Sequence, residues 1–309
     1  LAASLVSVSA NAGSLTISGA ASMNVGGYSG QEHDGGATFS MGNQVTMSGG
    51  GELDNGMTVS ISYQLDSGVS GPFDDHSVTV SSDAMGSLTL HGHGAGSATS
   101  AMDATAAGNV WDTFDTSIGL ATGVTHTNSA PTNNALSYVM PTIMDGVAVN
   151  LSYKPQSSGN SIDSGVGYAV TYTGMEGLTL VYSMSDIVGT SADLSGEQTA
   201  WKASYAYGPV TATVTQSEYD VTTTTSDQDV SSMAVSYTIS DEMSVTYGTE
   251  TIESTSSGHI DAEYDVIKGS YTSGGMTVSA QRKTAENIDH STNANADLEY
   301  WGLGLAFAF

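Results

Sequence analysis

Two histidines with strand-like spacing, His91 and His93, have side chains whose chemistry could bind a metal ion. Imidazole nitrogen is a common zinc ligand, and alternation along a strand would place both side chains on one face. A zinc site needs at least a third protein ligand, and no other residue has a clear spacing that supplies it. We therefore predict that these histidines make one face of their strand polar, as the inner wall of a β-structure would be, or that they anchor a neighbouring loop.

Three carboxylates, Asp261, Glu263 and Asp265, share one face of a predicted strand. The parity of Ile267 and Tyr271 makes this the apolar, outward face. Carboxylates facing lipid hydrocarbon are costly, so we expect them above a bilayer, at a subunit interface or beyond a β-bulge. Their hard oxygen atoms suit Ca²⁺ or Mg²⁺. The sequence requires no cofactor, and it leaves open a divalent cation bound here or by other acidic loops.

The balance of charge is strongly acidic. Five Lys and Arg residues oppose 32 Asp and Glu residues, which gives a formal net charge of −27. Five cations cannot form a basic patch, so the composition excludes nucleic-acid binding. The absence of cysteine excludes disulfides and thiolate metal sites. Two interpretations of the acidity stay open: a solvated surface suited to high salt, or an acidic pore and loops that concentrate cations.

Alternation of apolar and polar residues recurs along the whole chain. In residues 57–65, Met57, Val59, Ile61, Tyr63 and Leu65 alternate with Thr, Ser and Gln. A period of two predicts β-strands with one apolar and one polar face. We predict sixteen such strands, at residues 14–25, 37–50, 57–66, 77–82, 87–93, 134–140, 147–155, 165–172, 178–186, 198–207, 209–217, 228–239, 243–251, 262–272, 276–284 and 297–309.

The connections between these strands alternate strictly between short and long. Short ones, such as Asp54-Asn55-Gly56, carry tight-turn residues, whereas long ones are rich in Ser, Thr, Asn and Asp. Tyrosines of the apolar face gather at both strand ends, as two aromatic girdles would. The other face is polar, so sixteen strands would enclose water rather than a packed core. The sequence predicts an all-β, antiparallel transmembrane barrel.

On these features the chain resembles the alphaproteobacterial general porins, over nearly all of residues 13–309. The most specific parts are Leu15-Thr-Ile-Ser-Gly-Ala-Ala-Ser-Met, the hairpin from Val45 to Asn55-Gly-Met, and Gly86-Ser-Leu-Thr-Leu. The last strand also matches, and its Phe309 resembles the assembly signal of such barrels. The resemblance implies a homotrimer in the bacterial outer membrane, in contact with lipid and lipopolysaccharide, through which small hydrophilic solutes diffuse. It also implies that the third long loop folds inward and narrows the pore.

That loop would span residues 94–133. The resemblance implies that its acidic residues Asp103, Asp112 and Asp115 lie at the constriction, and the alternative is an acidic loop exposed outside. Trp111 and Phe114 would anchor the loop against the wall.

The cations of the wall depart from the family's pattern, which usually opposes several arginines to the acidic loop. The single arginine here, Arg282, faces outward by parity. The inward lysines are few and scattered, so we expect a net negative pore that prefers cations. The predicted lumen wall includes His91, His93, Lys154, Lys202, Lys268 and Lys283.

The first twelve residues differ in composition from the rest of the chain. Leu1–Ala12 joins an apolar segment to Ala10-Asn11-Ala12, which fits the cleavage pattern of a secretory signal peptide. We therefore predict a residual signal peptide at 1–12 and the barrel at 13–309. The alternative is an ordinary strand or tail.

The sequence argues against two further classes of function, an enzyme and a structural protein of the cell surface. An enzyme needs a nucleophile, a base and an orienting group brought together, and Ser and Thr are too frequent here to single out a triad. We therefore do not expect an enzyme. A surface-layer or filament subunit would need a packed interior or edges that pair between molecules, and the polar inner face argues against it.

Overall fold

The computed structural model describes residues 15–30, 36–66, 74–94, 97–102, 104–114, 133–155, 162–189, 195–221, 227–254, 260–292 and 297–309. The predicted leader at 1–12 lies outside the described residues, as do Asp103 and Asp115.

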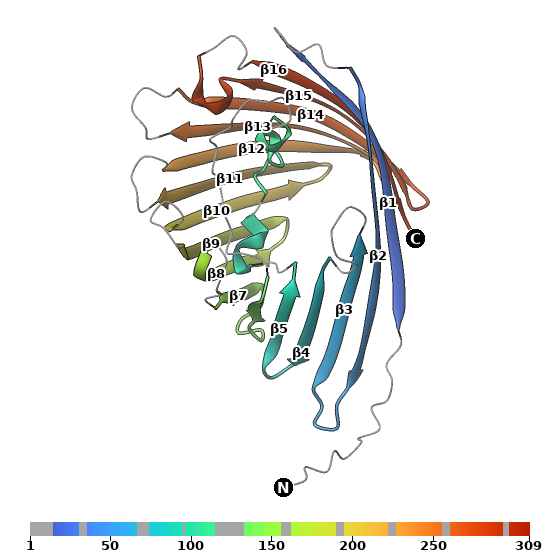
Figure 1. Cartoon of the computed structure of the whole chain (residues 1–309), viewed down its shortest axis with the longest axis vertical. Helices are drawn as coiled ribbons and strands as arrows, with labels where there is room; N and C mark the ends of the chain where they lie inside the picture. The colour runs from blue at the N-terminus through green and yellow to red at the C-terminus, as the bar shows by residue number, and fades with distance from the viewer. Residues whose placement is uncertain are drawn as a thin grey trace.

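Sixteen strands and three short 3₁₀ helices make up the described chain (Figure 1). The strands are β1 (Thr16–Gly30), β2 (Thr38–Glu52), β3 (Thr58–Asp66), β4 (His76–Ser82), β5 (Gly86–His93), β6 (Ala135–Val139), β7 (Val147–Lys154), β8 (Ile162–Met175), β9 (Leu178–Gly189), β10 (Gly196–Tyr207), β11 (Val210–Val221), β12 (Gln228–Ser240), β13 (Met243–Ser254), β14 (Ala262–Ser273), β15 (Met276–Glu286) and β16 (Leu298–Ala308). The helices are η1 (Ala98–Met102), η2 (Val110–Thr113) and η4 (Ile288–His290). In the described part of the chain, no helix is long and apolar enough to span a bilayer.

The strands form one closed antiparallel barrel. Each strand pairs with its neighbours in sequence, and β1 closes the ring by pairing with β16 from Ala20 opposite Ala308 to Gly30 opposite Leu298. Closure leaves no free strand edge, which is the condition for a sheet that crosses a bilayer. The predicted sixteen-stranded antiparallel barrel is therefore confirmed.

Tight turns join the strands at one end of the barrel. In the β2–β3 turn, Gly56 has a positive φ of 79°, and the Met57 amide donates a hydrogen bond of 3.1 Å to Oδ1 of Asn55. An Asn-Gly pair suits such a turn because both residues tolerate positive φ at low cost. The turn pairs β2 with β3 in a register that puts Met47 opposite Tyr63 on the outer face.

Large apolar side chains cover the outside of the barrel. Phe39 is 82% exposed and Met41 is 69% exposed, which is unusual for residues of this type in a water-soluble protein. Strand alternation turns the intervening Thr38 and Ser40 to the inside. The barrel thus presents an apolar surface to lipid and a polar surface to its lumen.

The largest apolar core lies between the chain after β5 and the inner wall. Phe114, Val110 and Ile252 are fully buried there, and Tyr264 is nearly so. The short helices η1 and η2 contact strands β7–β10 and β14 respectively, within the ring of strands (Figure 1).

Candidate functional site

The segment between β5 and β6 begins and ends at one point of the wall. The Gly94 amide donates to Oδ1 of Asn133 at 3.2 Å, and the Asn134 amide donates to the Gly92 carbonyl at 3.4 Å. The described parts of this segment, residues 97–102 and 104–114, then run along the inside of the barrel. They form the element that the sequence identified as the third long loop.

The first part of the segment packs on the inner faces of β7–β10. Met102, in η1, is 4% exposed and clusters with Val181 of β9 and Ala200 of β10. Both wall residues point inward, since their neighbours Tyr182 and Trp201 are exposed on the outer face.

The second part is joined to the wall by backbone amides. The Ala106 amide donates to Oγ1 of Thr215 at 3.0 Å, and the Ala107 amide donates to Oγ of Ser232 at 2.9 Å. Gly248 lies directly beneath Ala107: an added Cβ at Gly248 would be 2.9 Å from Cβ of Ala107. The wall therefore needs glycine there for the segment to approach.

Glu250 of β13 is the most deeply buried acidic side chain at this contact, with 1% exposure. The Thr105 hydroxyl donates to its Oε2, and the Trp111 amide donates to its Oε1 at 3.4 Å. A buried carboxylate is tolerated only when hydrogen bonds replace its water. Here the segment itself supplies those donors, so the carboxylate and the segment hold each other in place.

The aromatic residue Phe114 fills the space between the segment and β1, β14 and β16. Its ring is 6.2 Å from Tyr28 in an edge-on arrangement and 6.1 Å from Tyr264. The Tyr28 hydroxyl also donates to the carbonyl of Thr113 at 2.6 Å. Trp111 is partly buried against the same core.

The predicted wall lysines occupy a different place from the one the family pattern suggests. All four lie at inward-facing positions of their strands. Two of them, however, are covered by the segment and form hydrogen bonds with it, instead of facing it across the open lumen. Lys268 Nζ donates to the Ala107 carbonyl at 3.5 Å, and Lys283 Nζ donates to the hydroxyl of Thr113. Lys154 is buried, with 4% exposure, and Lys202 is half-buried on β10.

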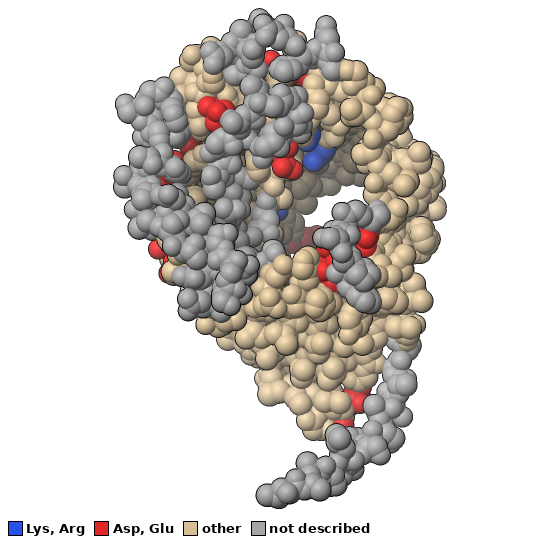
Figure 2. All heavy atoms as spheres, in the orientation of Figure 1, with Lys and Arg blue, Asp and Glu red and all other residues tan. Residues whose placement is uncertain are grey.

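The acidic residues of the segment are placed only in part. Asp112, in η2, is exposed, and Asp103 and Asp115 lie outside the described residues. Their position at a constriction therefore stays a prediction. Figure 2 shows an opening through the molecule, with basic side chains at its edge.

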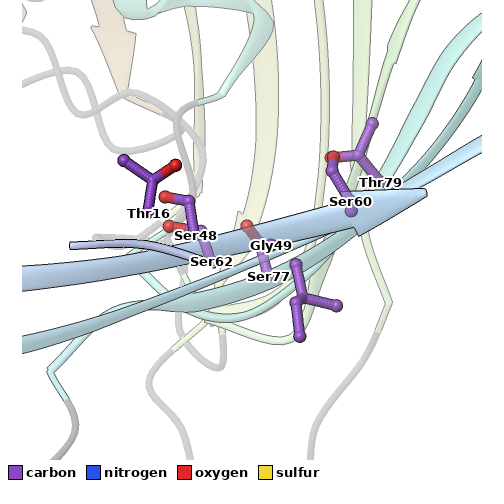
Figure 3. A pocket seen from close by; sticks show the side chains of 9 residues that line it. Thr16, Ser48, Gly49, Ser60, Ser62, Ser77 and Thr79 are labelled. Carbon is purple, nitrogen blue, oxygen red and sulfur yellow. The ribbon is translucent and has the colours of Figure 1, made fainter. Parts of the chain in front are cut away.

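The wall of β1–β4 carries a group of hydroxyl side chains. A hollow of about 300 Å³ on this wall is lined mainly by serine and threonine (Figure 3). The hydroxyl-bearing residues are Thr16, Ser48, Ser60, Ser62, Ser77 and Thr79.

The two histidines of β5 have different hydrogen-bond partners. His91 faces the lumen, where its Nε2 lies 2.9 Å from the Ser137 hydroxyl. His93 lies beyond a register shift between His76 and Ser77, and its Nδ1 is 3.3 Å from Oδ1 of Asp75.

The sequence analysis missed the ligands that accompany His93. Asp74 and Asp75 both approach its ring, although their spacing from His93 in the sequence did not single them out. Aligning the predicted strand at 77–82 with the one at 87–93 would have brought these aspartates into view.

The predicted cation site at Asp261, Glu263 and Asp265 is not a converged cluster. Asp265 accepts a hydrogen bond of 2.8 Å from the Tyr247 hydroxyl, and Glu263 lies opposite Glu286. Successive outward residues of one strand are separated by about 7 Å, too far to share one ion without further ligands. Cation binding there stays a prediction.

Arg282 has the outward parity expected from the sequence. Its Nη2 lies 2.7 Å from Oε1 of Glu299, with both side chains largely exposed. The arginine is thus engaged outside the lumen.

A family model described as Gram-negative porin matches residues 1–265. The chain belongs to this family. Closed barrels of outer-membrane porins are also similar to it in structure. The anion-selective porin from Comamonas acidovorans has a TM-score of 0.72 at 14% identity, and the match covers 96% of this chain and 99% of that one. A search of curated proteins gives no match.

Two further porin structures agree with this fold. OmpF of Salmonella typhi in complex with daunomycin has a TM-score of 0.69 at 14% identity, with 96% of this chain and 98% of that chain covered. The trimer form of OmpT from Vibrio cholerae has a TM-score of 0.70 at 14% identity, with 97% and 100% covered. The porin described here is accordingly a protein of the bacterial outer membrane.

Proposed function

We propose that this porin is a general diffusion channel, without enzymatic activity, that passes small hydrophilic solutes through a water-filled lumen. The observation that carries the proposal is the segment 104–114, which is fastened inside a polar barrel by Thr215, Ser232 and Glu250. Such a segment narrows the lumen without filling it. Selection then rests on the size and charge of the solute.

The proposed preference is for cations. The acidic excess of the sequence supports it, as does the engagement of Lys268 and Lys283 in hydrogen bonds with the segment. The hydroxyl-lined wall offers no arginine to attract anions. The anion-selective neighbour from Comamonas acidovorans indicates that this fold alone does not fix the sign of selectivity.

The proposed assembly is a homotrimer of the alphaproteobacterial type, in contact with lipopolysaccharide. The trimer form of OmpT is a precedent for the assembly. In the described residues, the outward face of β1–β5 carries no Asp, Glu, Lys or Arg side chain, whereas that of β9–β15 carries many. An uncharged apolar face supports subunit contact through β1–β5.

The acidic outer face of β9–β15 supports a proposed role for Ca²⁺ or Mg²⁺. Glu197 lies opposite both Asp186 and Asp220, and Asp229 lies opposite both Glu218 and Glu253. Like charges directly opposite each other on a sheet are destabilising. Divalent cations that bridge these carboxylates to anionic lipid head groups would offset the repulsion.

Conductance across a planar bilayer tests the proposed function. We expect the purified porin to insert as open channels and to give, across a salt gradient, a reversal potential with the sign of cation preference. Folded protein that never conducts would contradict the channel and favour a structural role. A reversal potential with the opposite sign would contradict only the proposed selectivity.

A further inference from the structure

The outer ends of β4 and β5 bring three metal-ligating side chains together. One ligand atom each from Asp74, Asp75 and His93 lies within 4.8 Å of the other two. Nδ1 of His93 is 3.3 Å from Oδ1 of Asp75 and 3.7 Å from Oδ1 of Asp74. In the described portion of the chain, this is the one group of three such residues that converges so closely.

An ion pair alone does not account for this arrangement. Asp75 by itself would satisfy the Nδ1 of His93. Adjacent residues of an extended strand point to opposite faces, yet Asp74, at the bend before β4, sends its carboxylate to the same nitrogen. Two neighbouring carboxylates repel each other, and a shared cation removes that repulsion.

The backbone around the two aspartates is fixed by the sheet. The Gln64 amide donates to the Asp75 carbonyl at 2.8 Å, and the Asp74 amide donates to the Gln64 carbonyl at 2.9 Å. Pairing with β3 therefore extends through both residues. The three ligands thus come from ordered strand ends, which favours a site with defined geometry.

The Asp75 carboxylate occupies space that is open only because residue 94 is glycine. Gly94 has a φ of +67°, and a Cβ added to it would lie 1.7 Å from Oδ1 of Asp75. Any other residue would displace the carboxylate from His93. The register shift between His76 and Ser77 completes the arrangement, because it sets His93 opposite His76 at the top of the β4–β5 pair.

We propose that Asp74, Asp75 and His93 bind a divalent transition-metal ion of the zinc class. Zinc ligands lie about 2.0–2.2 Å from the ion, so two ligands of a tetrahedral site are about 3.3–3.6 Å apart. The 3.3 and 3.7 Å separations at His93 match that spacing. One imidazole and two carboxylates suit zinc better than Ca²⁺ or Mg²⁺, which prefer oxygen ligands throughout. Water completes the coordination, since all three side chains are partly exposed.

The ion would bind next to the point where the internal segment leaves β5. His93 precedes Gly94, whose amide is tied to Asn133 at the far end of that segment. A metal bound by Asp74, Asp75 and His93 would join the start of β4 to this point. This consequence for the pore rests on the proposed channel function, whereas metal binding itself does not.

Zinc titration of the untagged, full-length porin in detergent tests the site. We expect one saturable Zn²⁺ site per protomer by calorimetry, and an unfolding temperature that rises with Zn²⁺ because the ion binds the folded state. Excess Mg²⁺ should not abolish the binding. Separate His93→Gln and Asp75→Asn variants should each weaken Zn²⁺ binding at least about tenfold, by analogy with the loss on removing groups that support a metal site.

Two matched variants make the test decisive. His91→Gln removes a histidine from the same strand, and Asp54→Asn removes an aspartate from the turn at the opposite end; both should bind Zn²⁺ as the unmodified protein does. An absent saturable site would overturn the proposal and leave an ion pair. Equal binding by all variants, or equal loss in the His91→Gln variant, would overturn it as well. Each result is independent of whether the protein conducts.

Discussion

The hydroxyl of Thr105 donates a hydrogen bond to the carboxylate of Glu250 across 145 residues of sequence. The contact joins the internal segment to β13 at a point where Glu250 is almost inaccessible to solvent. Since the amide of Trp111 also donates to this carboxylate, one side chain holds both ends of the stretch 105–111. Glu250 is therefore a positioning residue of the lumen.

The Glu250→Ala variant should loosen the segment. It leaves the Thr105 hydroxyl and the Trp111 amide without their acceptor, and each unsatisfied buried group costs about 1–3 kcal/mol. We expect a lower unfolding temperature, greater current noise and a larger mean conductance in single-channel records.

The conservative Glu250→Gln variant keeps an acceptor oxygen and should retain most of the unmodified conductance. Glu253→Gln, on the same strand but exposed, serves as the control. If Glu250→Ala and Glu253→Gln gave the same records, the carboxylate would not be what positions the segment.

Close approach at Gly248 leads to a second prediction. A methyl group there would lie 2.9 Å from Cβ and 3.0 Å from Cα of Ala107, so the segment must shift in the Gly248→Ala variant. We expect an altered conductance and a reduced unfolding temperature. Gly269→Ala is the control on the next strand, because its nearest neighbour, the carbonyl of Ser244, would be 3.7 Å from the new Cβ. Similar changes in both variants would indicate a general effect of filling strand glycines.

Much of the barrel could be predicted from sequence because lipid on one side and water on the other impose a strict alternation. The residue types at Asn55-Gly56 also predict the turn there. Strand ends were less accessible: β1 continues past the predicted residue 25 to Gly30, pairing Tyr28 with Tyr300 and Ser29 with Glu299. Backbone pairing continues there beyond the end of the alternating apolar pattern, so hydropathy alone predicts a strand that is too short.

The site was harder to predict because it depends on contacts distant in sequence. Parity gives the face of Lys268 and Lys283 correctly, but it does not reveal that the segment lies over them. The bend at Asp74 likewise lets this carboxylate reach His93, and no periodic pattern encodes such a bend.

Burial of Phe114 yields a prediction about stability. Its ring is fully buried among Tyr28, Tyr264 and the wall, so Phe114→Ala should lower the free energy of unfolding by about 3–5 kcal/mol. Phe39→Ala removes the same side chain from the outer face, where the ring is 82% exposed, and should cost much less. Urea unfolding of both variants in the same detergent compares them. Equal losses would mean that the internal core contributes little to stability.

The last prediction concerns Asp112, the acidic residue of η2 that is exposed. If it faces the conducting path, Asp112→Asn should reduce the cation preference measured by the reversal potential, without closing the channel. The variant that also changes Asp103 and Asp115 to asparagine should reduce it further. Screening limits the effect: the Debye length falls from ~30 Å at 0.01 M salt to ~10 Å at 0.1 M. The difference between variant and unmodified porin should therefore shrink as salt rises.

Asp54→Asn is the matched control for Asp112, since it removes one carboxylate at a short turn far from the segment. Its reversal potential should equal that of the unmodified porin at each salt concentration. An unchanged potential in the triple variant would put these aspartates outside the conducting path. Anion preference in the unmodified porin would have a different meaning: the lumen-facing lysines, Lys202 above all, would then set the field despite the net charge of −27. Lys202→Met should in that case shift the potential toward cations, whereas under cation preference it should change the potential little.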